Sequence, residues 1–183
     1  MNWKTSKSDP LRIAEIDLGE RQKLGLSFCP GKTQRFAESG PWKRDLEADL
    51  FRIRSKGFEV VVTLIEAQEF VELQVEEMQE GAVEEAEMKW IWVPIVDGDV
   101  PTEANDDGLN EVLNSMLSGE SVFVHCKGGL GRAGTVSAWL LTHYGRTAQE
   151  AISEVRGVRN GALENQRQEN WVRAHAMTFL GRE

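Results

Sequence analysis

Short apolar runs alternate with amphipathic stretches along this chain. Runs rich in β-branched and aromatic residues predict strands at 24–28, 60–64, 90–93 and 121–125. Between the strands, apolar residues recur at helical spacing, for example at Leu109, Val112, Leu113 and Met116. Because strands and helices alternate over residues 22–145, we expect an α/β fold with three layers, in which a mostly parallel central sheet is flanked by helices.

The two ends of the chain carry different patterns. From Thr135 onward the apolar spacing is helical, and the last helix is expected to run through Trp171 and Phe179. At the other end, residues 1–20 are polar with isolated apolar positions. We therefore expect a polar N-terminal arm that docks as a short extended piece, followed by a single domain over residues 21–183.

Glutamate is concentrated between residues 66 and 89, where nine glutamates are interleaved with apolar positions. Gly81 is expected to divide this segment into two amphipathic helices. Charge runs on helices usually lie on a solvated face. We therefore interpret these glutamates as surface residues rather than as a site for a basic partner.

Length, composition and charge narrow the class of protein. A chain of 183 residues fits one compact domain, and 40% hydrophobic with 28% charged residues is typical of a folded globular protein. The longest apolar stretches, such as 136–141, are far shorter than the ~18 residues that cross a bilayer, so no membrane partner is expected. The polar first ten residues lack the apolar core of a secretory signal, which predicts a cytoplasmic location. A net charge of −9 would repel a nucleic-acid backbone, so no nucleic-acid partner is expected either.

The candidate chemistry lies between the strand at 121–125 and the next helix, in the loop His125-Cys126-Lys127-Gly128-Gly129-Leu130-Gly131-Arg132. A loop from a strand to a helix N-terminus points several backbone N–H groups, and the positive end of the helix dipole, at one centre that binds an anion. Its glycines let the backbone curl closely around the ligand, and Arg132 offers a planar fork that matches two phosphate oxygens. The same groups would stabilise a thiolate at Cys126 and make it a nucleophile near neutral pH.

Other sequence motifs are alternative interpretations of this loop. Residues 129–134 fit the dinucleotide fingerprint GxGxxG, and Glu154 lies where that motif asks for an acidic residue. That residue should end a second strand, however, whereas Glu154 falls inside a helical pattern. A Walker A loop is excluded because its Lys-Ser/Thr pair is missing. A plain turn with a small buried Cys126 remains as an alternative, but it leaves Arg132 without a role.

The pattern His-Cys-x5-Arg resembles the phosphate loop of the protein tyrosine phosphatase superfamily, in its cysteine-dependent dual-specificity branch. Within that branch, residues 24–32, 94–98 and 125–132 are similar to the kinase-associated phosphatases and their prokaryotic relatives. The resemblance covers residues 22–180. It implies that Cys126 attacks phosphorus to form a phosphocysteine and that His125 supports the loop and the thiolate. It also implies that the phosphate is bound by the loop residues Lys127, Gly128, Gly129, Leu130, Gly131 and Arg132.

Hydrolysis of a phosphoester needs an acid, because the leaving oxygen must be protonated as its bond to phosphorus breaks. By the resemblance, Asp97 is this acid and later takes a proton from the attacking water. Asp99 is the nearest rival, and a turn beside Gly98 is the non-catalytic alternative. Gln168 is a candidate for orienting the hydrolytic water, although Asn165 and Gln168 also have the spacing of a helix N-cap and its partner.

Several positions depart from the family pattern or stand outside it. Ala133 follows the arginine, where most members have a Ser or Thr whose hydroxyl stabilises the departing cysteine, so breakdown of the phosphoenzyme is expected to be slow. Glu164 stands where a glutamine is usual. Lys32 is interpreted as an exposed turn lysine rather than as a substrate contact. Cys29 is interpreted as structural, with a protective disulfide to Cys126 as the alternative.

These patterns predict a phosphatase, independent of metal and cofactor, that removes phosphate from phosphotyrosine in proteins, with phosphoserine and phosphothreonine as further candidates. Its expected partner is a phosphorylated protein or a small phosphate ester. One alternative is a pseudophosphatase that binds a phosphorylated partner with little turnover. Another is a lipid, nucleotide or small-molecule phosphatase with the same cysteine chemistry, although Leu130 replaces a lysine found in the lipid phosphatases that share Lys127. A rhodanese-type sulfur transferase would have no need of Asp97.

Overall fold

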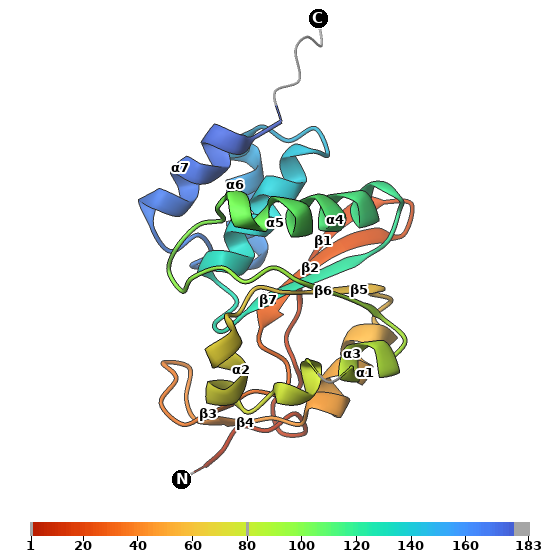
Figure 1. The fold of residues 1–183 in the computed structure, drawn as a ribbon, viewed down its shortest axis with the longest axis vertical. Coiled ribbons are helices and arrows are strands. Elements are labelled where there is room, and N and C mark those ends of the chain that lie inside the picture. Colours follow the sequence, from red (N-terminus) through yellow and green to blue (C-terminus); the bar gives the residue numbers. More distant parts are fainter. Residues whose placement is uncertain (1, 80, 178–183) are drawn as a thin grey trace, which may run out of the picture.

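A five-stranded sheet with the strand order β1-β2-β7-β5-β6 forms the centre of the molecule (Figure 1). The structure is a computed structural model, and it describes residues 2–79 and 81–177. Four strands run parallel to one another: β2 (Gln22–Phe28), β7 (Val122–Cys126), β5 (Val60–Thr63) and β6 (Lys89–Trp92). The edge strand β1 (Ala14–Gly19) is antiparallel to β2. The predicted mostly parallel sheet is therefore confirmed.

Helices cover both faces of this sheet (Figure 1). One face carries α4 (Asp106–Leu117), α5 (Gly131–Thr142), α6 (Ala148–Val158) and α7 (Gln166–His175). The other face carries α1 (Leu46–Ser55), α2 (Ala67–Leu73), α3 (Ala82–Glu85) and a short ribbon of β3 (Thr33–Gln34) and β4 (Trp42–Lys43). Two short 3-10 helices, η1 (Glu76–Met78) and η2 (Glu103–Asn105), lie in the connections. The predicted three-layer α/β arrangement is thus confirmed.

The central strands divide their side chains between two hydrophobic cores. On β5, Val60 and Val62 belong to the core under α4 to α7, whereas Val61 belongs to the core under α1 to α3. On β7, Val124 belongs to the core under α4 to α7, and Phe123 belongs to the core under α1 to α3. Successive side chains of a strand point to opposite faces, so a strand covered on both sides is apolar at every position. This is why the strands appear in the sequence as continuous apolar runs.

The segment expected to be an N-terminal arm is built into the domain from Leu11 onward. Leu11 is fully buried, and Ile16 on β1 is buried opposite Leu24 of β2. The isolated apolar residues of this segment therefore face the cores, while its polar residues suit the exposed side of an edge strand. The N-terminal segment is thus docked in extended form, with β1 as an edge strand of the sheet.

The glutamate-rich segment is less regular than expected. It forms α2, η1 and α3, and a left-handed Gln74 (φ 57°) ends α2 before Gly81 opens α3. Most of its described glutamates are exposed, but Glu69 is buried, so the interpretation as a surface residue is wrong at that position. At the other end of the chain, α7 ends at His175, and Phe179 lies outside the described residues.

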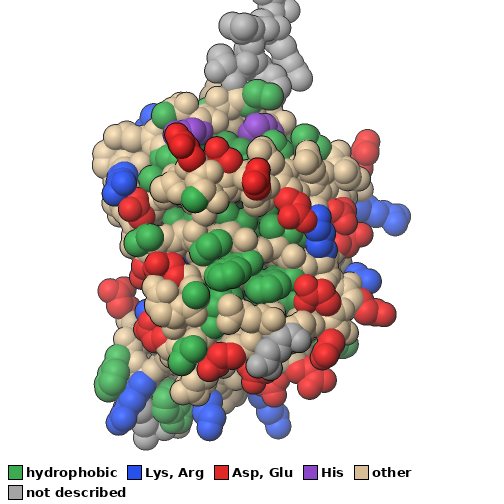
Figure 2. All heavy atoms as spheres, viewed as in Figure 1, with side chains coloured by type: hydrophobic (Ala, Val, Ile, Leu, Met, Phe, Trp, Pro, Cys, Tyr) green, Lys and Arg blue, Asp and Glu red, His purple; other side chains and the backbone are tan. Residues whose placement is uncertain are grey.

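Acidic side chains are scattered across the face of the molecule shown in Figure 2, around a central area of hydrophobic side chains. This distribution accords with the net charge of −9. Within residues 2–79 and 81–177, no helix is both long and apolar enough to cross a membrane.

Candidate active site

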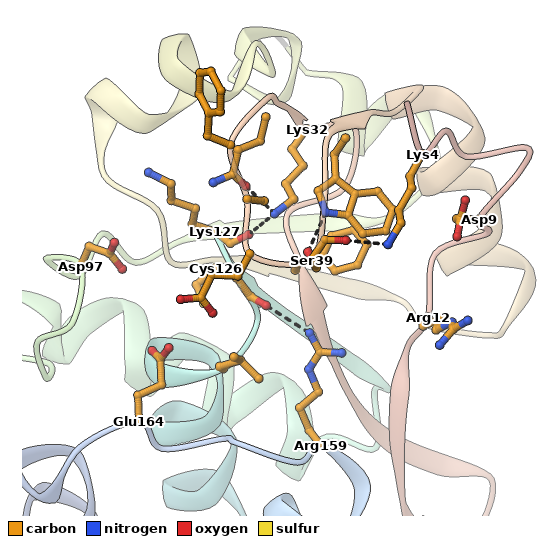
Figure 3. A pocket seen from close by; sticks show the side chains of 18 of the residues that line it. Lys4, Asp9, Arg12, Lys32, Ser39, Asp97, Cys126, Lys127, Arg159 and Glu164 are labelled. Carbon is orange, nitrogen blue, oxygen red and sulfur yellow. Dashed lines mark hydrogen bonds between the residues drawn. The ribbon is translucent and has the colours of Figure 1, made fainter. Parts of the chain in front are cut away.

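The loop that follows β7 lies at the carboxyl end of the central strand, between β2 and β5. Four residues separate Cys126, the last residue of β7, from Gly131, the first residue of α5. This strand–loop–helix arrangement is the one expected from the sequence. Cys126 is 3% exposed and lines a cavity of about 550 Å³ (Figure 3). The carboxyl ends of parallel strands are the usual place for ligand sites in α/β folds.

Arg159, which directly follows α6, holds the backbone of this loop with two hydrogen bonds. Arg159 donates from Nη2 to the carbonyl oxygen of Gly128 and from Nε to that of Gly129, both at 3.1 Å. Because a trans peptide is planar, the N–H groups of Gly129 and Leu130 must point away from Arg159. Gly129 N–H accordingly donates to the Cys126 sulfur at 3.2 Å. The loop therefore turns backbone donors toward the cysteine, as an anion-binding loop requires.

Two glycines of the loop lie close to their neighbours, Gly129 against backbone atoms and Gly131 against the ends of two side chains. Gly129 has φ +70°, and a Cβ at this position would lie 2.2 Å from the backbone carbon of Ser27 on β2. At Gly131, a Cβ would lie 2.1 Å from a carboxylate oxygen of Glu164 and 2.7 Å from the side-chain nitrogen of Gln168. The loop thus fits directly against its neighbours because it carries no side chain at these points.

Arg132 is buried in the first turn of α5, with its side chain 1% exposed. Its Nη1 and Nη2 donate to the two carboxylate oxygens of Glu69 at 2.6 and 2.9 Å, and Nη1 also donates to Ile95 O at 3.0 Å. Nε has no partner among the described residues. Burial acts to raise the pKa of Glu69, but the hydrogen bonds from Arg132 and from Glu66 N–H, together with the charges of Arg132 and Lys127, lower it. One edge of the guanidinium is therefore fixed by a carboxylate, and the buried Nε keeps a hydrogen bond that no described residue uses.

Asp97 and Asp99 differ in their surroundings. The Asp97 side chain is 62% exposed, lines the cavity and lies 2.8 Å from Arg132 Nη2. Asp99 accepts a hydrogen bond from Val100 N–H at 2.7 Å and pairs with Arg167 at 3.0 Å, and it does not line the cavity. Of the two candidate acids, the structure brings Asp97 to the cysteine's cavity.

His125 is buried beneath the loop in a chain of side-chain hydrogen bonds. Trp90 Nε1, which can only donate, bonds to Thr63 Oγ1 at 2.9 Å, and Thr63 Oγ1 lies 2.8 Å from His125 Nε2. The Thr63 hydroxyl therefore links Trp90 to His125 Nε2, while Nδ1 is buried and has no partner among the described residues. Burial lowers the pKa of His125 to about 3, so the ring is neutral near pH 7.

Gln168 has the helix-capping contact that the sequence allowed, and its role toward the hydrolytic water stays a prediction. Its backbone N–H bonds to the side chain of Asn165 at 3.0 Å, so Asn165 is the N-cap of α7. Its side chain is fully buried, accepts from Glu164 N–H at 2.8 Å, and lies against Gly131. Gln168 Nε2 also donates to Asp99 O at 3.4 Å. This residue thus connects the start of α7 with the loop that carries Asp97.

Lys32 is buried, and the expectation of an exposed turn lysine is wrong. It is 2% exposed, lines the cavity, and donates from Nζ to Lys127 O at 3.0 Å. The turn around Gly31 packs tightly against Leu46, which folds Lys32 inward. Cys29 is also buried, burial raises the pKa of its thiol, and both cysteines are free in the structure.

Not every predicted site residue reaches the cavity. It is lined by Asp97, Cys126, Lys127, Gly128 and Leu130, whereas His125, Gly129, Gly131, Arg132 and Gln168 lie behind this surface. The sequence analysis missed the supporting residues Thr63, Glu69 and Arg159. Of these three residues, only Glu69 could have been recognised as buried from the sequence. It lies four residues before Leu73 and therefore shares the apolar side of its helix.

Comparison with known proteins agrees with this geometry. A family model described as "Swiss Army Knife protein, DSP-PTPase phosphatase domain" matches residues 45–173. Cyclin-dependent kinase inhibitor 3 from Sus scrofa is 28% identical over 175 residues, which cover 89% of this chain and 77% of that protein. Dual specificity protein phosphatase CDC14C from Symphalangus syndactylus is 36% identical over 85 residues, 46% of this chain. This chain matches only 17% of the length of that second relative.

Solved structures share the fold. The kinase associated phosphatase, with its catalytic-site cysteine replaced by serine, superposes with a TM-score of 0.77 at 23% identity, covering 90% of this chain and 93% of that chain. Tk-PTP in its active form superposes with a TM-score of 0.63 at 27% identity, covering 89% and 96%. The resemblance expected from the His-Cys-x5-Arg loop is therefore confirmed. The chain belongs to the dual-specificity phosphatase (DSP-PTPase) family.

Proposed function

We propose that this protein is a metal-independent phosphatase that hydrolyses phosphomonoesters through a phosphocysteine. One observation carries the proposal: Cys126 opens into a cavity beside Asp97, and Asp97 is paired with the buried Arg132. A nucleophile, a proton donor and a fixed cation thus meet at one point. A cysteine in a loop could by itself be structural, but a structural role explains neither the pairing of Asp97 with Arg132 nor the opening of Cys126 into the cavity.

The proposed reaction has two steps. In the first, the Cys126 thiolate attacks phosphorus, the phosphorus–oxygen bond to the leaving group breaks, and Asp97 gives its proton to the leaving oxygen. Arg132, from its free Nε edge, and the loop N–H groups stabilise the charge on the three non-bridging oxygens. In the second step, water attacks phosphorus, Asp97 takes a proton from the water, and inorganic phosphate leaves as the thiolate is restored.

Supporting roles follow from the contacts of the remaining residues. His125 is held neutral by burial, is hydrogen-bonded to Thr63 and lies directly before the cysteine, which suits a residue that keeps the loop and the thiolate in position. Lys127, Gly128, Leu130 and Gly131 form the rest of the phosphate loop with Gly129. Gln168 is buried against Gly131, which is compatible with orienting the water of the second step.

Phosphotyrosine in proteins is the proposed substrate, with phosphoserine and phosphothreonine as further candidates. The cavity wall contains Phe28 and Trp42, whose ring centroids lie 5.0 Å apart, and aromatic walls suit an aryl phosphate. The names of two related proteins link them to kinases, which fits a phosphorylated protein as the partner. Cytoplasmic location stays a prediction from the N-terminal sequence.

A panel of substrates at equal concentration tests this proposal, with EDTA present throughout. It contains one peptide carrying phosphotyrosine, phosphoserine or phosphothreonine, a short-chain phosphoinositide and a nucleotide monophosphate. We expect the highest kcat/KM for the phosphotyrosine peptide, and none for any substrate with Cys126→Ser. A preference for the lipid or the nucleotide would favour a small-molecule phosphatase. Binding of the phosphopeptide without turnover would favour a pseudophosphatase, the alternative suggested by Ala133 in place of the usual Ser or Thr.

A further inference from the structure

Lys32 is an unusual lysine because its charged end is buried at the cavity. Its Nζ donates to Lys127 O at 3.0 Å and to Gln34 Oε1 at 2.7 Å, and lies 5.0 Å from the centre of the Phe28 ring. Among the described residues it forms no ion pair with a carboxylate. A buried ammonium group is costly unless an anion compensates for it. An anion that enters the cavity would supply this compensation.

The charged and titratable groups around Lys32 come from three segments. Cys29 lies on the same turn, Cys126 and Lys127 belong to the phosphate loop, and Arg44 follows β4. Arg44 is already neutralised by two hydrogen bonds to Asp49, at 2.7 and 2.8 Å. Lys127 is paired with Glu72 at 2.6 Å. Of the three cations Lys32, Arg44 and Lys127, only Lys32 thus has no ionic partner among the described residues. Of the two cysteines beside it, Cys126 is the one that lines the cavity and can become an anion there.

We propose that Lys32 is a second cation of the phosphate site: it fixes the loop at the Lys127 carbonyl, and its charge stabilises the Cys126 thiolate and the incoming phosphate dianion. The proposal rests on the phosphatase function given above. Figure 3 shows Lys32 reaching the loop from the side opposite to Glu164, with its amino group directed at the backbone beside Cys126. Lys32 acts through the loop and through its field, as a positioning residue with an electrostatic effect.

The proposal predicts a pH dependence that a purely structural lysine would not give. Burial lowers the pKa of Lys32 to about 8, against the opposing effect of the neighbouring thiols of Cys29 and Cys126. In the free enzyme the charge should therefore be lost as the pH rises through about 8. Because kcat/KM reports ionisations of the free enzyme, its alkaline side should fall in that range. Replacing Lys32 by arginine keeps the charge and should move this fall to higher pH.

The test compares Lys32→Met, Lys32→Gln and Lys32→Arg with Lys43→Met, which removes one exposed positive charge from the same ribbon. The first readout needs no substrate: the rate of iodoacetamide alkylation of Cys126 as a function of pH, followed by peptide mass spectrometry. We expect the midpoint of this profile to rise by about one pH unit in the Met and Gln variants and to stay near the wild-type value in Lys32→Arg and Lys43→Met. The second readout is kcat/KM for an aryl phosphate, expected to fall about tenfold in the two neutral variants.

Each outcome of this test either supports or overturns the proposed role of Lys32. An unchanged alkylation profile in Lys32→Met, with kcat/KM within about twofold of Lys43→Met, would overturn the proposal. If Lys32→Met fails to fold by circular dichroism, the wild type and Lys32→Arg decide, because the alkaline fall near pH 8 must be present in the first and displaced in the second. A wild type that hydrolyses nothing yet shows the expected alkylation differences would overturn the proposed function while supporting the role of Lys32.

Discussion

Arg132 and Glu69 are 63 residues apart in the sequence, yet they share two hydrogen bonds, of 2.6 and 2.9 Å, in the interior of the protein. The pair joins the first turn of α5 to α2, which lie on opposite sides of the sheet (Figure 1). Glu69 takes up the two terminal nitrogens of the guanidinium. Its carboxylate thereby fixes the plane in which Arg132 can meet a phosphate.

Glu69→Gln should therefore lower both activity and stability. Removing one partner of a buried charge pair leaves the other charge uncompensated, which typically costs about 3–5 kcal/mol. We expect a comparable loss in the free energy of unfolding, measured by urea denaturation, and a fall in kcat/KM of ~10- to 100-fold. Glu77→Gln, an exposed glutamate outside the site, is the matched control. Equal effects of the two substitutions would contradict the buried ion pair, because Glu69 would then behave like an exposed glutamate.

Asp97→Asn should slow the reaction more than Asp99→Asn. Loss of a general acid typically costs about 10²- to 10⁴-fold, whereas Asp99 is engaged by Arg167 and Val100 away from the cavity. The defect of Asp97→Asn should shrink as the leaving group becomes more acidic, because a stable phenolate needs no proton. A series of substituted aryl phosphates measures this trend. A leaving-group trend that appears only in Asp99→Asn would assign the acid to Asp99.

Ala133→Ser should speed the breakdown of the phosphoenzyme. Ala133 is fully buried directly after Arg132, and a hydroxyl at this point could donate to the cysteine sulfur as it leaves. Rapid-quench experiments on the wild type should give a burst of the leaving alcohol followed by a slower steady state. The serine variant should raise the steady-state rate by several-fold, on the order of what one hydrogen bond contributes. Ala138→Ser, the same change farther along α5, should leave the rate as it is.

Stability should fall in mild acid because of His125. The pKa of this residue is about 3 in the folded protein, and the usual value is 6.5. The unfolded chain therefore binds a proton that the folded protein does not, and stability present above pH 6.5 is lost as the pH falls toward 3. Between pH 7.5 and 5.5 the expected loss from this group is ~1.4 kcal/mol.

Chemical denaturation at the two pH values measures this loss in the wild type and in His125→Gln. Burial also lowers the pKa of His143, so the difference between the two proteins isolates His125. Replacement of the exposed His175 by glutamine is the control. A pH dependence in His125→Gln equal to that of the wild type would contradict the neutral, buried state of this residue.

The sequence predicted the parts of this protein that depend on local pattern. Apolar runs located the four parallel strands, and the glycine-rich turn between a strand and a helix located the phosphate loop. The N-terminal segment was expected to dock as a short extended piece, but its place as edge strand β1 could not be predicted because an edge strand needs few apolar residues. The supporting contacts could not be predicted, because Thr63, Glu69 and Arg159 reach the loop only through the tertiary fold. Lys32 was misjudged for the same reason, since its burial depends on how the turn at Gly31 packs.

The central claim is that phosphate passes through the sulfur of Cys126, and trapping this intermediate tests it most directly. The protein is mixed with an aryl phosphate in EDTA, quenched in acid within milliseconds and examined by peptide mass spectrometry. We predict a phosphorylated Cys126 in the wild type, at a lower level in Ala133→Ser, and no phosphorylation and no hydrolysis in Cys126→Ser. Hydrolysis that persists in Cys126→Ser, or that proceeds in the wild type with phosphate on another residue, would contradict the account.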